Sequence, residues 1–93
     1  MLFWMHKLAL SIGYLHDNNI VHRDIKMENI LLDENSVPKL CDFGLCKRIL
    51  PGQTDSTLCG TPSYMAPELI QRLEYCMSPD WWSYGIIFYQ LME

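Results

Sequence analysis

Three polar clusters carry residue types that can do chemistry, and they follow one another in a fixed order. They are His22-Arg23-Asp24 with Lys26 and Asn29, then Asp42-Phe43-Gly44, then Ala66-Pro67-Glu68. Carboxylate and amide oxygens are hard ligands of the kind that Mg²⁺ prefers, and a carboxylate can also accept a proton. Each cluster alone is weak evidence, because an Asn in a turn or an Asp beside a Gly is common structural punctuation. Coincidence cannot explain all of them together, because each specified position lowers the chance of a match by a factor of about twenty.

These clusters resemble the signature of the protein kinases, and the resemblance covers essentially all 93 residues. In that family the first cluster is the catalytic loop, and the other two bound the activation segment, here residues 42–68. Lys26 and Gly60-Thr61-Pro62 are typical of serine/threonine kinases. The stretch from Leu58 to Pro62, with Asp80-Trp81-Trp82, is similar to the AGC group, and the calcium/calmodulin-dependent group is a near neighbour. The resemblance implies transfer of the ATP γ-phosphate to Ser and Thr hydroxyl groups of protein substrates.

The resemblance also implies roles at the reacting groups. Asp24 would accept or orient the proton of the substrate hydroxyl, and Lys26 would neutralise the γ-phosphate in the transition state. Asn29 and Asp42 would hold Mg²⁺. The residues expected to bind the nucleotide and its metal are Lys26, Glu28, Asn29, Leu31 and Asp42.

Three of the predicted contacts concern the adenine ring and the acceptor protein. Leu31 resembles the apolar residue beneath the adenine ring, although a core Leu explains it equally well. Thr61 resembles the residue that contacts the catalytic aspartate and favours Ser or Thr acceptors. Glu28 would read a basic residue near the acceptor, and an ordinary exposed Glu is the simpler interpretation.

Regulation is expected at Thr57, which directly precedes Leu58-Cys59-Gly60. Related kinases carry an activating phosphate there, added by an upstream kinase, and such a phosphate could order the loop by pairing with Arg23. Thr54 and Ser56 remain rival acceptors.

Five further residues are expected to have structural roles. His22 is interpreted as structural rather than as a base, and Phe43, next to the metal-binding aspartate and followed by Gly44, is expected to pack into the core. Asp80 resembles the buried acid that ties the catalytic-loop backbone to the central helix. Glu68 is expected to pair with an arginine in a later part of the family's domain.

Apolar periodicity predicts the elements that position these clusters. Met1, Met5, Leu8, Ile12 and Leu15 form one stripe of a helix over residues 1–17. Two short strands are predicted at 29–32 and 37–40, followed by a long loop over 43–63. A weak helix is predicted at 65–73, and a second one opens at Ser78-Pro79-Asp80, with Ser78 as its cap. The fold class is therefore α+β: a kinase-like, mainly helical C-terminal lobe with short strands around the catalytic loop.

Composition excludes several classes of protein. Seven Lys and Arg against eleven Asp and Glu give a net charge of −4, which argues against nucleic-acid binding. The N-terminal apolar run is too short for a signal core or a membrane span, so a cytoplasmic or nuclear setting without a membrane partner is expected. The four cysteines form no close pair, which favours free thiols over a disulfide or a metal site.

The apolar content is large for so short a chain. It amounts to 49% of the 93 residues, and the segment 82–92 is apolar on nearly every face, as in a helix surrounded by a larger protein. We therefore expect residues 1–93 to be a partial kinase domain without its N-terminal lobe, inactive and marginally folded in isolation. Ile25 and Met27 stand where Leu and Pro are commoner in the family. The alternative function is a catalytically dead, kinase-like interaction module.

Overall fold

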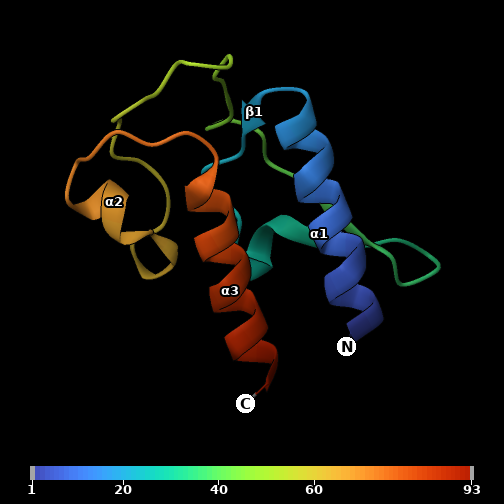
Figure 1. The fold of residues 1–93 in the computed structure, drawn as a ribbon. Coiled ribbons are helices and arrows are strands. Elements are labelled where there is room, and N and C mark those ends of the chain that lie inside the picture. Colours follow the sequence, from blue (N-terminus) through green and yellow to red (C-terminus); the bar gives the residue numbers. More distant parts are fainter. Residues whose placement is uncertain (1, 93) are drawn as a thin grey trace.

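The computed structural model describes residues 2–92, and its first element is the predicted helix α1, Leu2–Asp17. Met5, Leu8 and Ile12 are buried, so the apolar stripe faces inward as its spacing predicts. Met1, the first residue of that stripe, lies outside the described residues. The second long helix, α3, spans Ser78–Met92. The two helices run antiparallel side by side (Figure 1), and the hydroxyl of Tyr84 on α3 donates to the carbonyl of Met5 at 2.9 Å.

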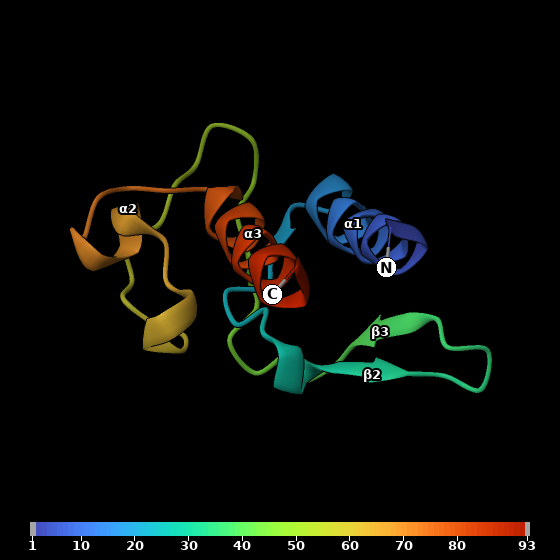
Figure 2. The ribbon, with the colours of Figure 1, turned by 90° about the horizontal axis from the view of Figure 1, so that it is seen from below.

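The strands form two small antiparallel sheets, one of which is a hairpin. β2 (Ile30–Leu32) pairs with β3 (Pro38–Leu40) in the register Ile30 to Leu40, and this hairpin lies alongside α1 (Figure 2). The carboxylate of Asp33 accepts the amides of Val37 and Asn35 in the turn, which lowers the pKa of Asp33. The predicted helix is therefore confirmed over residues 2–17, and both predicted strands are confirmed.

The predicted loop over 43–63 contains a strand that sequence analysis missed. β4 (Lys47–Arg48) pairs with β1 (Ile20–Val21), so that Val21 lies opposite Lys47. The two residues of β4 are both charged and show no apolar pattern, unlike the β-like run Ile20-Val21-His22, and the pairing partner is more than twenty residues away in sequence.

The weak helix predicted over 65–73 is much shorter in the structure. After the 3₁₀ turn η2 (Pro62–Tyr64), only α2 (Pro67–Ile70) is helical, and Arg72 then takes a left-handed φ of 58°. Ser78 is the first residue of α3 and not the cap before it, and its hydroxyl donates to Glu68. Helix α3 lies between α1 and α2 (Figure 1).

The core lies between α1, the catalytic loop and α3. Its buried members are Met5, Leu8, Ile12, Ile25, Tyr64 and Ile87, and a smaller cluster of Ala66, Leu69 and Tyr75 lies near α2. Helix α3 also leaves large apolar side chains exposed, among them Trp82 and Tyr89, as its all-round apolar pattern indicates. All four cysteines are free, and none of the helices within residues 2–92 is long and apolar enough to cross a membrane.

The packing of α1 predicts how two substitutions on this helix differ. Ile12→Val removes one methylene from a fully buried site and should lower the free energy of unfolding by about 1 kcal/mol. Leu10→Ala, at an exposed site of the same helix, is the control and should change it by less than about 0.5 kcal/mol. Urea denaturation measures both, and equal losses would contradict this assignment of the buried face.

Candidate active site

The predicted catalytic loop, residues 22–29, lies between β1 and β2 and is anchored to α3 by one carboxylate. Asp80 is fully buried, and its two oxygens accept the backbone amides of His22 at 2.8 Å and Arg23 at 2.9 Å. Arg23 takes a left-handed φ of 72°, which costs a non-glycine residue on the order of 1 kcal/mol or more. The hydrogen bonds to Asp80 hold this strained turn in place.

Sequence analysis missed a third donor to Asp80. His16, in the last turn of α1, donates its Nε2–H to the carboxylate at 2.8 Å, and its ring meets the Trp81 ring edge to face. The sequence does contain an indication of this contact, because His16 lies four residues after Ile12 and therefore falls on the buried stripe of the helix. A polar residue on such a stripe has to find a buried partner.

His22 connects the catalytic loop to the strand that precedes Asp42. The amide of Asp24 donates to Nδ1 of His22 at 3.1 Å, so Nε2 carries the proton and donates to the carbonyl of Cys41 at 3.2 Å. Both ring nitrogens of this fully buried side chain are thus occupied by backbone groups.

The carboxylate of Asp24 is held on both of its oxygens. Thr61 donates its hydroxyl to Oδ1 at 2.9 Å, and Asn29 donates its amide to Oδ2 at 3.2 Å and to the Asp24 carbonyl at 2.8 Å. Lys26 donates to the Thr61 hydroxyl at 2.9 Å, with its Nζ 4.0 Å from Oδ2 of Asp24. The fold therefore gathers three of the predicted residues, Thr61, Asn29 and Lys26, around the carboxylate of Asp24.

Gly60 is what allows Thr61 to reach this group. Its φ is +104°, and a Cβ at this position would lie 2.6 Å from the carbonyl oxygen of Arg23. Only glycine tolerates both the left-handed backbone and this close approach.

Asn29 and Asp42 flank neighbouring strands of the β2–β3 hairpin. The amide of Cys41 donates to the carbonyl of Asn29 at 2.9 Å, and Asp42 is the next residue, with a left-handed φ of 57°. Asn29 uses its amide nitrogen for Asp24, which leaves its oxygen for another partner, and the Asp42 side chain is exposed. These two hard oxygen donors fit Mg²⁺, which takes few protein ligands and completes its shell with phosphate and water oxygens. In residues 2–92 no group of three or more His, Cys, Asp and Glu side chains could hold a metal by itself.

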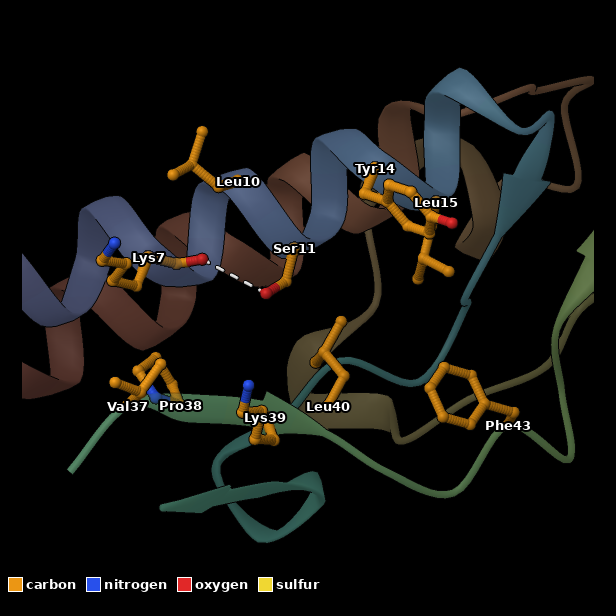
Figure 3. A pocket seen from close by; sticks show the side chains of 10 residues that line it. All are labelled: Lys7, Leu10, Ser11, Tyr14, Leu15, Val37, Pro38, Lys39, Leu40 and Phe43. Carbon is orange, nitrogen blue, oxygen red and sulfur yellow. Dashed lines mark hydrogen bonds between the residues drawn. The ribbon is translucent and has the colours of Figure 1, made fainter. Parts of the chain in front are cut away.

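The two apolar residues predicted near the nucleotide are both exposed. Leu31 on β2 is 58% exposed, so the alternative of a core leucine is wrong. Phe43 is 52% exposed, which contradicts its predicted packing into the core. Its ring centroid lies 5.3 Å from that of His22 in an edge-to-face arrangement, and the ring also lines a hollow of about 550 Å³ between α1 and β3 (Figure 3). Within the described residues this contact covers only part of the ring.

Three more predicted residues lie at the periphery. Glu28 is exposed, as an ordinary surface Glu would be, and Gly44 donates its amide to Asp42 at 3.4 Å. Glu68 accepts the hydroxyl of Ser78 at 2.6 Å, which joins α2 to the start of α3.

Arg23 has a partner that sequence analysis missed. Its Nη1 donates to Asp55 at 2.7 Å, and Lys47 lies 3.1 Å from the same oxygen of Asp55. Thr57, the predicted phosphorylation site, is exposed and donates its hydroxyl to the other oxygen of Asp55 at 2.9 Å. Nothing in the local sequence distinguishes Asp55 from a solvated loop acid.

Two pKa values in this region are strongly shifted. Burial alone would raise the pKa of Asp55, but hydrogen bonds from Lys47, Thr57 and two backbone amides outweigh it and lower the pKa to about 2. Burial, aided by the negative charge of Asp80, raises the pKa of the Cys46 thiol to about 11. Cys46 is therefore a poor nucleophile at neutral pH.

The close approach at Gly60 predicts a difference between two glycine substitutions. Gly52 also has a positive φ, of 84°, but open space around its missing Cβ. Gly52→Ala should lower the free energy of unfolding by about 1 kcal/mol, and Gly60→Ala should lower it by clearly more, about 3 kcal/mol. Chemical denaturation compares them, and equal effects would contradict a required contact at Gly60.

The pKa of Asp55 predicts a loss of stability in acid. Because the folded pKa lies below the unfolded value of about 3.9, the ionised Asp55 stabilises the fold above about pH 4, and this contribution is lost as the pH falls toward 2. Between pH 4 and 2 the free energy of unfolding should therefore fall less steeply in Asp55→Asn than in the wild type. Parallel slopes in a denaturation series would contradict the prediction.

Comparison with known proteins finds similar sequences among the protein kinases. The chain is 50% identical to serine/threonine-protein kinase akt-2 of Caenorhabditis elegans, 46% to protein kinase C epsilon type of Rattus norvegicus, and 43% to atypical protein kinase C of Drosophila melanogaster. Each match covers 97% of this chain but only 17%, 12% and 15%, respectively, of the relative, so the chain spans less than a fifth of their length. The family model described as the protein kinase domain matches residues 1–93. The chain belongs to the protein kinase domain family.

Proposed function

We propose that this chain provides the catalytic loop and activation segment of a serine/threonine protein kinase. The observation that carries the proposal is the Asp24 carboxylate, held by Thr61 and Asn29 beside the ammonium group of Lys26. The relatives named above are themselves protein kinases, which supports phosphoryl transfer to a protein.

Asp24 is the residue that receives the proton in this reaction. The hydroxyl oxygen of the acceptor forms a bond to the γ-phosphorus as the bond to the departing ADP oxygen breaks, and the hydroxyl proton passes to Asp24. Its carboxylate is fixed before the acceptor arrives, so little reorganisation is needed. Lys26 contributes positive charge beside the transferred group.

The nucleotide side of the site is assigned to the β2–β3 hairpin. Asn29 and Asp42 would hold Mg²⁺, which neutralises phosphate charge when it is bound. Leu31 supports this assignment because it leaves an apolar side chain exposed on the same hairpin, where an adenine ring could rest. Glu28, two residues before β2, is also exposed and is available to a ribose or to a basic residue of the protein substrate.

Serine and threonine acceptors are the substrates we propose. Thr61 supports this choice because its hydroxyl bridges Asp24 and Lys26 and so places the activation segment directly against the catalytic carboxylate. Thr57 is proposed as the target of an upstream kinase, since it is exposed in that same segment. Neither the family match nor the relatives support the alternative of a non-catalytic interaction module.

Kinase assays on the full-length protein test the proposal. Asp24→Asn should lower kcat for phosphorylation of a Ser/Thr peptide by a factor of about 10² or more, because it removes the proton acceptor. Nucleotide binding should change less than about threefold. Asp42→Ala should instead abolish Mg²⁺-dependent ATP binding.

Asp17→Asn is the matched control, because Asp17 is an exposed acid at the end of α1, and both activities should stay at the wild-type level. Wild-type transfer by Asp24→Asn would overturn the catalytic assignment. Mg²⁺-dependent ATP binding that survives in Asp42→Ala would overturn the metal assignment.

A further inference from the structure

Asp55 already holds the place in which a phosphate on Thr57 would be expected. One of its oxygens accepts Arg23 at 2.7 Å and lies 3.1 Å from Lys47. The other accepts the amide of Ser56 at 2.8 Å and the hydroxyl of Thr57 at 2.9 Å. The paired side chains of Arg23 and Asp55 are each only 10% exposed, so water screens their attraction weakly.

Backbone contacts fix Asp55 in this position. Asp55 and Tyr75 form an isolated β-bridge in which each amide donates to the other's carbonyl, at 2.9 and 2.8 Å. The Tyr75 hydroxyl donates to the carbonyl of Thr57 at 2.8 Å, and Nε of Arg23 donates to the carbonyl of Leu45 at 2.7 Å. Through Asp55, the activation segment is thus linked to Arg23 of the predicted catalytic loop, to Lys47 of β4 and to Tyr75.

We propose that Asp55 is a positioning residue that takes the role of an activation-segment phosphate, so that the segment is ordered while Thr57 is unmodified. An anion is what two converging cations require, and a carboxylate built into the chain meets that requirement at all times. The ordering rests on these contacts alone, and only its effect on catalysis rests on the proposed kinase function.

Phosphorylation of Thr57 would then exchange one anion for another. A phosphate carries about −1.5 to −2 charges at pH 7, and the Thr57 oxygen lies 2.9 Å from the Asp55 carboxylate. The phosphate would be attached to that oxygen, so its charged oxygens would lie close to the Asp55 carboxylate and repel it, and both nearby cations are already paired with Asp55. A phosphate therefore competes with Asp55 for Arg23.

Hydrogen exchange on the full-length, phosphatase-treated protein tests the ordering. The amides of Asp55 and Tyr75 should be protected in the wild type, and Asp55→Asn, which keeps the shape but removes the charge, should speed their exchange about tenfold or more. Thr57→Val, which removes the phosphate acceptor, and the control Asp17→Asn should stay within about threefold of the wild type. Equally fast exchange in unphosphorylated wild type and Asp55→Asn would overturn the proposal.

Protection in α1 and α3 shows in the same experiment whether Asp55→Asn has unfolded as a whole. If Asp55→Asn has unfolded, the variant Lys47→Met tests the proposal instead, because it removes one exposed cation and leaves the Arg23–Asp55 pair. It should speed exchange at Asp55 and Tyr75 by a few-fold with α1 unchanged, and unchanged exchange at these two amides would overturn the proposal.

Kinase activity then tests the consequence for catalysis. Unphosphorylated wild type and Thr57→Val should have kcat values within about twofold of the Thr57-phosphorylated wild type. Unphosphorylated Asp55→Asn should lose at least tenfold, and phosphorylation of Thr57 in that variant should restore activity. A wild type that needs the phosphate as much as Asp55→Asn does would overturn the proposal, whereas inactivity of all forms with normal exchange would count against the proposed function alone.

Discussion

The buried carboxylate of Asp80 is the group on which the rest of the site depends. It sits at the start of α3 with no exposure to water, where an unpaired charge would be very costly. Its oxygens are satisfied by three N–H groups, from His16 in α1 and from the backbones of His22 and Arg23. Burying this charge therefore forces the two long helices and the catalytic loop into one arrangement.

The strained parts of the site follow from that anchor. With its amide held by Asp80, Arg23 takes a left-handed φ of 72°, and its carbonyl oxygen faces Gly60 at a distance that leaves no room for a side chain. This contact brings the next residue, Thr61, within hydrogen-bonding distance of Asp24. The position of Asp24, the proposed proton acceptor, thus depends on a glycine 36 residues further along the chain, because both contact the same turn.

The side chain of Arg23 adds an electrostatic constraint to those of its backbone. Its guanidinium is nearly buried and needs an anion, and the described chain supplies Asp55. The activation segment is consequently connected to the predicted catalytic loop by charge at Asp55 and by hydrogen bonds at Leu45 and Thr61. The contact at Thr61 lies at the Asp24 carboxylate, the proposed proton acceptor, which makes the order of the segment relevant to chemistry.

The sequence by itself determined the kinase family, helix α1, the β2–β3 hairpin and the existence of α3. Each of these is encoded locally, in a motif or in apolar spacing over a few turns, as at Met5, Leu8 and Ile12. Only the tertiary structure decided the pairing of β4 with β1, the contact of His16 with Asp80 and the exposure of Phe43. It also decided that Arg23 pairs with Asp55, 32 residues away. Such contacts depend on how distant segments fold together, and no local pattern of residue types records which charge will meet which.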